Sequence, residues 1–128
     1  MTEIKTSELT GPALDWAVAK CEGWTTYALP VSIAQIWMQR GVDARGACVL
    51  HSLYELAYST NWSQGGPIIE RMCIWLSHNI ATGIHGAALD ADGNYLRTGP
   101  TPLIAAMRCF VASKLGDEVD VPTELCYG

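Results

Sequence analysis

Apolar residues recur at three- and four-residue spacing in the last third of the chain, and this pattern predicts a helix over residues 102–115. Thr101 suits the N-cap, Pro102 suits the first helical position because no backbone N–H is needed there, and Gly116 can take the left-handed conformation that ends helices. The face expected to be buried carries Leu103, Ala106, Met107, Phe110 and Val111. Charged residues fall elsewhere on the wheel, so we expect one face to pack on a core and the rest to be solvated.

The same spacing near the beginning of the chain predicts a first helix that begins at Thr10, Gly11 and Pro12 and ends at Gly23. Its buried face is expected to carry Leu14, Ala17, Val18 and Cys21. Its outer side is expected to carry Asp15, Lys20 and Glu22. The run after this helix, residues 24–29, is rich in aromatic and β-branched residues, which predicts a short strand.

Residues 31–57 are ambiguous in pattern. The segment that follows Ser32 fits either a two-turn helix or an irregular strand, since periodicity alone does not separate them. Gly41, Asp43 and Gly46 indicate a turn. The apolar run after the turn suits a buried strand or a helix, and we favour a strand at residues 48–50.

A second helix is predicted after Asn61 or Ser63, either of which suits the N-cap, with Pro67 at an early helical position. Its buried face is expected to carry Ile68, Ile69, Met72, Cys73 and Leu76. Residues 80–98 predict a hairpin around the Asp-Gly pair at residues 92–93, which favours positive φ.

The order of these elements indicates the fold class. Helix, strands, helix, hairpin and helix follow one another, which is typical of an α+β protein. We expect a small two- or three-layer sandwich, an antiparallel sheet with about three helices packed on it. A chain of 128 residues is long enough for one core, so residues 1–128 are predicted to form a single domain.

Net charge and hydropathy limit the kinds of molecule that the protein is expected to bind. The formal net charge is −5, and the eight Lys and Arg residues are scattered, so we expect no polymeric nucleic acid partner. A small molecule with one or two phosphates remains compatible with this charge, because a helix N-terminus binds them through backbone N–H groups. The sequence contains no run of about 20 apolar residues and no secretion signal, so we expect no membrane contact and a place in the cytosol where the protein is made.

Titratable residues form no recognisable catalytic or metal-binding motif. The five cysteines are odd in number and lack a C-x-x-C pair, and we expect them to be free buried thiols. His51, His78 and His85 lack the spacing of metal-binding motifs. We therefore expect no metal, no cofactor and no enzyme activity.

The loop from Tyr58 to Pro67 is the strongest candidate for a binding site, because it brings two glycines and several polar side chains to the start of a helix. Such a place suits an anion or a carbonyl group, and Tyr58 and Trp62 add flat faces for a base or a nicotinamide ring. The alternative is purely structural. The Gly-Gly-Pro sequence then only caps the helix, and Trp62 only holds the loop against the core.

Residues 99–102, at the start of the last helix, bring a second set of free N–H groups, although capping alone explains them well. If both helix starts lie at one edge of the sheet, they converge on one ligand, with Arg97 or Arg71 as its charge partner. The candidate ligand-binding residues are Tyr58, Thr60, Asn61, Trp62, Gln64, Gly65, Gly66, Arg71, Arg97 and Thr101.

Three ungapped blocks carry a family resemblance. They read KTSELTGPALDWAVAKCEGW at residues 5–24, YSTNWSQGGPIIER at residues 58–71 and GPTPLIAAMRCFVASKLGDEV at residues 99–119. In this order they resemble the NinX family of lambdoid bacteriophage accessory proteins. The resemblance implies a small phage sandwich fold and an accessory role, and small phage proteins of that kind often act against host defence. None of the blocks is a general catalytic motif.

These observations lead to a functional hypothesis. We expect a non-catalytic binder that sequesters a nucleotide-derived signal molecule of a bacterial immune system. One alternative is a protein-interaction module that inhibits a host enzyme through its negative charge and exposed aromatics such as Trp24, Trp37 and Tyr127. Another is a phosphodiesterase that degrades the signal. Because five tryptophans are many for a small sandwich, we also expect a homo-oligomer, most simply a dimer.

Overall fold

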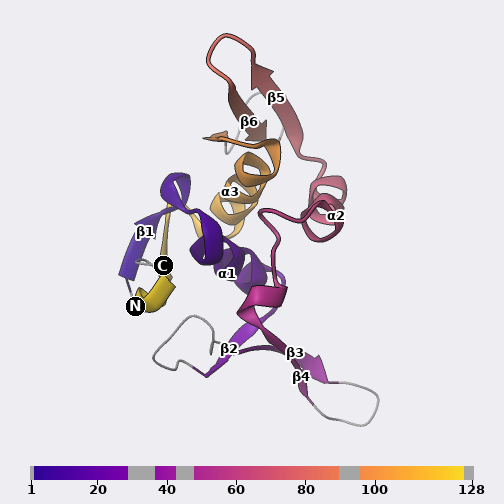
Figure 1. Ribbon diagram of the computed structural model, residues 1–128, viewed down its shortest axis with the longest axis vertical. Helices are drawn as coiled ribbons and strands as arrows, with labels where there is room; N and C mark the ends of the chain where they lie inside the picture. Colours follow the sequence, from indigo (N-terminus) through magenta and orange to yellow (C-terminus); the bar gives the residue numbers. More distant parts are fainter. Residues whose placement is uncertain (1, 29–36, 43–47, 90–95, 126–128) are drawn as a thin grey trace.

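The computed structural model describes residues 2–28, 37–42, 48–89 and 96–125. In these residues, three α-helices and three small antiparallel sheets form the molecule (Figure 1). The predicted α+β class is therefore confirmed. The strands form three separate sheets instead of one. Two sheets join strands that are consecutive in the chain and that α2 (Trp62–Met72) divides into two groups, and the third joins the first strand to the last.

Helix α3 (Pro102–Leu115) lies at the centre of the fold, and its predicted bounds are confirmed. The Thr101 hydroxyl oxygen accepts the N–H of Ile104 at 3.1 Å, and Gly116 ends the helix with φ of +90°. Burial is wider than the single predicted face and includes Leu103, Ala105, Ala106, Met107, Cys109, Phe110, Val111 and Ala112. The reason is tertiary, since α1, α2 and the strands around β6 all pack against this helix.

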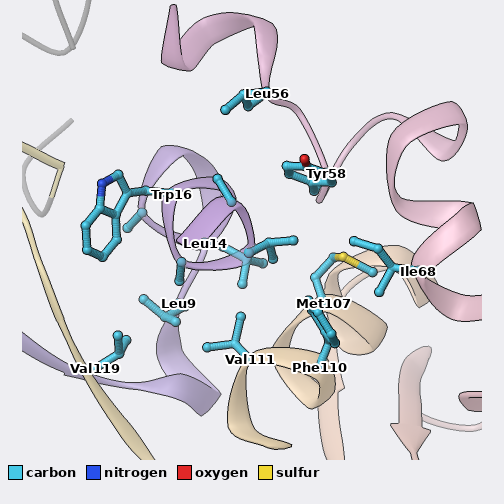
Figure 2. Packing of buried hydrophobic residues seen from close by; sticks show 14 of the residues in the cluster. Leu9, Leu14, Trp16, Leu56, Tyr58, Ile68, Met107, Phe110, Val111 and Val119 are labelled. Carbon is cyan, nitrogen blue, oxygen red and sulfur yellow. The ribbon is translucent and has the colours of Figure 1, made fainter. Parts of the chain in front are cut away.

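Helix α1 (Gly11–Cys21) packs on α3 to form the main core, as Figure 2 shows. Leu14 and Val18 are fully buried against this region, as the periodicity predicted. Asp15 corrects the prediction, because it was expected on the outer side and is only 9% exposed. The segment that precedes α2 covers it, and its carboxylate accepts the N–H of Ser59 at 2.8 Å.

The first and last strands of the chain pair with each other, β1 (Thr2–Lys5) with β8 (Glu118–Val121). A second sheet has the order β2–β3–β4, formed by β2 (Thr25–Ala28), β3 (Trp37–Val42) and β4 (Cys48–Ser52). The strands predicted at residues 24–29 and 48–50 are thus confirmed, with bounds that differ by one or two residues. The ambiguous segment after Ser32 lies outside the described residues up to position 36, and so does the predicted turn from position 43 onward.

Helix α2 (Trp62–Met72) begins after Asn61, whose side chain accepts the N–H of Ser63 at 2.9 Å. Pro67 lies inside this helix and not at its start, which corrects the prediction. The helix ends at Cys73, whose φ of +54° is left-handed. Cys73 and Leu76 are therefore exposed beyond the helix, although both were expected on its buried face.

The third sheet has the order β5–β6–β7, formed by β5 (Trp75–Asn79), β6 (Ile84–Ala88) and β7 (Arg97–Gly99). The antiparallel pairing of β6 with β7 confirms the predicted hairpin, whose turn lies outside the described residues. Strand β5 was not predicted. In Figure 1, β5 and β6 form an arm whose turn extends away from the helices, while α3 packs against its base.

The side-chain environments of three cysteines are described. Cys109 is buried in α3 and Cys21 is half-buried in α1, and burial raises the pKa of both thiols to about 11. These two fit the prediction of inert structural thiols, whereas Cys73 is exposed.

Candidate ligand-binding cleft

The starts of α2 and α3 line one cleft. Its walls are Ser59, Thr60 and Trp62 on the α2 side and Thr101, Leu103 and Ile104 on the α3 side, around a volume of about 190 Å³. The two helices approach closely here, because a Cβ atom added at Gly65 would lie 2.6 Å from Cδ1 of Leu103. The structure thus brings together the two helix starts whose convergence was predicted from the sequence.

The cleft combines an aromatic face with polar hydrogen-bonding groups. The side chain of Trp62 is 52% exposed, although tryptophan is usually mostly buried. The backbone N–H groups of Trp62 and Leu103 lie in the first turns of their helices, where no intrahelical acceptor exists. Both helix dipoles also present their positive ends to the cleft. The surface therefore suits a flat ring next to an electronegative group.

Ser59 lines the cleft and also forms a hydrogen bond with the buried Asp15. It is 1% exposed, and its hydroxyl is a buried side-chain polar atom without a hydrogen-bond partner among the described residues. Its backbone N–H donates to the carboxylate of Asp15. Burial raises the pKa of this carboxyl, and the hydrogen bonding to Ser59 offsets part of the shift.

Tyr58 and Gln64 were predicted site residues, and both have structural roles. The hydroxyl of Tyr58 accepts the indole N–H of Trp24 at 3.2 Å inside the core. The side chain of Gln64 accepts the N–H of Ala57 at 2.8 Å and donates to the carbonyl of Glu55 at 2.9 Å. These bonds hold the loop before α2 in place, and neither residue lines the cleft.

Asn61, Gly65 and Gly66 also serve the architecture of α2. Asn61 caps the helix, and Gly65 is the contact point with α3. Gly66 has more room, since an added Cβ would meet only the ring of Trp62 at 3.8 Å. Close packing therefore requires a glycine at position 65 but not at position 66.

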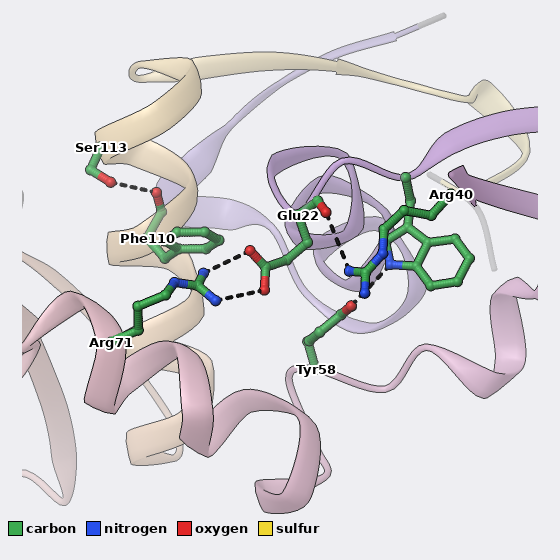
Figure 3. A network of polar contacts seen from close by, with 7 residues as sticks. Glu22, Arg40, Tyr58, Arg71, Phe110 and Ser113 are labelled. Atoms are coloured by element: carbon green, nitrogen blue, oxygen red, sulfur yellow. Dashed lines mark hydrogen bonds and ion pairs between the residues drawn. The ribbon is translucent and has the colours of Figure 1, made fainter. Parts of the chain in front are cut away.

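Arg71 lies at the opposite end of α2 from the cleft. Its guanidinium forms a bidentate ion pair with Glu22, with N···O distances of 2.7 and 3.2 Å, and lies 6.0 Å from the ring of Phe110 (Figure 3). The carbonyl of Glu22 also accepts a hydrogen bond from Arg40 at 3.3 Å. Arg71 therefore joins α2 to α1 and is not a charge partner in the cleft.

Arg97 lies in a different concavity. Its guanidinium pairs with Asp117 at 2.6 Å and lines a cleft of about 420 Å³ together with Lys5, Thr6, Ser7, Leu96, Thr98, Asp117 and Glu118. Neither arginine therefore accompanies the two helix starts, because each is engaged by a carboxylate elsewhere.

The structure changes which residues define the cleft. Thr60, Trp62 and Thr101 line it, as the hypothesis required. Ser59 and the apolar side chains of Leu103 and Ile104 were missed. Ser59 lies inside the loop selected from the sequence, so its position was a usable signal. Leu103 was assigned only to the buried face of the last helix, and Ile104 was given no role.

The tryptophans divide into buried and exposed classes. Trp16 and Trp24 are buried, so the suggestion that Trp24 is an exposed anchor is wrong. The side chain of Trp37 and all of Tyr127 lie outside what the structure describes. Trp62 in the cleft and Trp75 in β5 are the described tryptophans that reach solvent.

Within residues 2–28, 37–42, 48–89 and 96–125, no group of three or more His, Cys, Asp or Glu side chains is arranged to hold a metal ion. The helices in these ranges are all too short or too polar to cross a bilayer.

The fold and the cleft define a class of small α+β protein in which the starts of two helices and a half-exposed tryptophan share one concave surface. The sequence profile described as Bacteriophage P22, NinX matches residues 5–114, and the chain belongs to this NinX family. It is accordingly a phage accessory protein. A comparison with curated proteins found no match.

Proposed function

We propose that this phage protein binds a small nucleotide-derived molecule in the cleft between the starts of α2 and α3, without transforming it. The molecule is a signal of a bacterial immune system, and its capture in the host cytoplasm lowers the concentration that reaches the host effector. The observation that carries the proposal is the half-exposed indole of Trp62 beside two helix N-termini.

Each wall of the cleft has a role in this proposal. The indole of Trp62 stacks on the base, an interaction worth about 1–3 kcal/mol. The N–H groups of Trp62 and Leu103 donate to phosphate oxygens at the positive ends of the helices. Thr101 accepts a bond from Ile104, which leaves its own hydroxyl proton free to donate to the ligand.

The size of the cleft limits what it encloses. Its volume of about 190 Å³ is smaller than the roughly 300–1,000 Å³ of sites that bury a drug-sized ligand. The cleft therefore holds one ring or one phosphate group, and the rest of the ligand lies along the surface. Such partial enclosure favours a ligand with separate flat and charged groups.

Binding without reaction follows from the chemistry of the lining. Of the described residues that line the cleft, none is a His, Cys, Lys, Asp or Glu. The hydroxyls of Ser59, Thr60 and Thr101 thus have no general base beside them within this lining. A bound molecule is expected to be released unchanged.

Calorimetric titration with AMP, ADP-ribose and a cyclic dinucleotide tests the proposal. Trp62→Ala should weaken binding by about five- to 150-fold, the equivalent of one lost stacking contact. Trp75→Ala is the matched control, because its indole is exposed to a similar extent but lies in β5. It should leave the affinity unchanged.

The outcomes separate the alternatives. If none of the three compounds binds, or if both tryptophan variants lose affinity equally, the proposal is wrong. Mass spectrometry of the recovered compound identifies hydrolysis, which would favour a phosphodiesterase. A host protein recovered in stoichiometric amount from lysate, with no small molecule bound, would favour an inhibitor of a host enzyme.

A further inference from the structure

The β5–β6 arm exposes apolar side chains that the core does not use. All five residues of β5 are exposed, and in the turn after it Ile80 is 88% exposed. Cross-strand partners share a face of a sheet, so the register places Trp75, Ser77 and Ile84 on the same face. Trp75 and Ile84 are both about half exposed there. The arm therefore offers an apolar surface together with an open strand edge.

Contacts within the arm itself connect its two strands and its turn. Strands β5 and β6 pair residue by residue from Trp75 to Asn79 without a register shift. The imidazoles of His78 and His85 stack across the two strands with centroids 4.1 Å apart. In the turn, the side chain of Asn79 accepts the N–H of Ala81 at 3.0 Å. Among the described strands, β5 pairs with β6 alone, so its other edge is a preformed template for another strand.

Edge strands in natural proteins are usually guarded by charged residues, prolines or bulges. The pairings of β2 with β3 and of β3 with β4 contain register shifts, and β7 is short and carries Arg97. Strand β5 has none of these features. Between Arg71 and Asp90 the sequence contains no Asp, Glu, Lys or Arg and no proline. The β5 edge is therefore open to pairing.

The distribution of charge indicates that a second copy of the chain can pair with the β5 edge. The chain carries a net charge of −5, so two copies repel each other over most of their surfaces. The uncharged arm is a place where two copies can approach without opposing like charges. An antiparallel strand paired with itself about a two-fold axis is also self-complementary, which is the commonest geometry of soluble dimers.

We propose that β5 pairs antiparallel with β5 of a second copy, about a two-fold axis at Ser77. This pairing joins the two three-stranded sheets into one continuous sheet. Trp75 then lies opposite Asn79 of the second copy, Leu76 lies opposite His78, and Ile80 reaches the beginning of the other β5. The contact is smaller than in permanent dimers, so the dimer is reversible at micromolar concentration.

Sedimentation velocity over the micromolar range tests this pairing with two charged variants. Ser77→Glu and Ser77→Lys each place like charges at the two-fold axis, where directly opposed like charges destabilise a strand pair. Each variant alone should be monomeric, and an equimolar mixture should recover dimers. The control is Thr98→Glu, because Thr98 lies in the same cross-strand row and on the same face, but in β7 at the far edge of the sheet.

The expected result is a dimer for the wild type and for Thr98→Glu, a monomer for each Ser77 variant and a dimer for their mixture. Recovery in the mixture shows that the single variants are folded. The proposal is overturned if the wild type is monomeric at high micromolar concentration. It is also overturned if the single variants stay dimeric, or if the mixture stays monomeric while circular dichroism shows both variants folded.

Discussion

Helix α3 and the β5–β6 arm are both rich in apolar residues, but they use them in opposite ways. The apolar side chains of α3 are almost all buried by α1, α2 and the third sheet. In the arm, Trp75 is 59% exposed and Ile80 is more exposed still. Both regions contain large apolar side chains, so composition does not explain the difference in burial. The difference arises because several helices and strands surround α3, whereas few pack against the arm. The first region holds the fold together, and the second leaves large apolar side chains exposed to solvent.

The sharpest test of this comparison is truncation of one apolar side chain in each region. Phe110→Ala should lower the free energy of unfolding by about 3–5 kcal/mol, because it opens a cavity in the buried face of α3. Ile80→Ala should change it by less than about 0.5 kcal/mol, since this side chain is already solvated. Urea unfolding at low protein concentration measures both. Similar losses for the two variants would show that the arm is part of the core.

The two adjacent glycines of α2 provide a finer test of packing in the body of the protein. Gly65→Ala should destabilise the fold by about 1–3 kcal/mol, because the new Cβ clashes with Leu103 and with the carbonyl of Tyr58. Gly66→Ala should be neutral or stabilise the fold by up to about 1 kcal/mol, since the helix has room there. Thermal unfolding followed by circular dichroism measures the difference. Equal effects would contradict the close approach of α2 and α3.

Asp15 tests whether the interior also depends on a polar contact. Asp15→Ala should destabilise the protein by about 1–3 kcal/mol, because the buried N–H of Ser59 loses its acceptor. Asp15→Asn retains an acceptor and should lose less. Urea unfolding of both variants makes this comparison.

The pH dependence of the same residue has a defined sign. Burial raises the pKa of Asp15 above its ordinary value of 3.8, so the folded state holds this proton more tightly than the unfolded chain does. Its contribution to stability therefore falls as pH rises from 3.8 through the raised pKa. Asp15→Asn should lack this decrease. The opposite slope in a wild-type minus variant comparison would contradict the burial.

The smallest expected effect is at the ion pair that joins α1 to α2. Arg71 is about half exposed while Glu22 is mostly buried, so solvent screens the pair. A double-mutant cycle of Arg71→Ala and Glu22→Ala should give a coupling of less than about 1 kcal/mol. A larger coupling would show that polar contacts, and not apolar burial alone, set the stability of the body.

Local sequence signals predicted the helices well and the strands less well. Thr101 and Pro102 mark the start of α3, and Asn61 caps α2, because capping depends on residues only a few positions apart. Cys73 shows the limit of this logic. Its apolar spacing fitted a longer helix, yet the chain turns there into β5, whose existence depends on pairing with β6. Nothing in the local pattern of residues 74–79 predicted a strand that pairs with β6.

The candidate site was predicted only in part for the same reason. Trp62 and Thr101 were selected as helix-start residues, and both line the cleft. Arg71 and Arg97 were added for their charge, but Glu22 and Asp117 hold them elsewhere. Which cation meets which anion depends on segments far apart in sequence, so charge alone did not locate the arginines.

The sequence by itself determined the family, the α+β class and the starts of the last two helices. These follow from motifs, periodicity and capping, which act within a few residues of the chain. Only the tertiary structure decided that Asp15 and Trp24 are buried, that the starts of α2 and α3 share one cleft and that β5 is an edge strand among the strands that the structure describes. Burial and exposure depend on which distant segments cover a residue, and packing alone sets that arrangement.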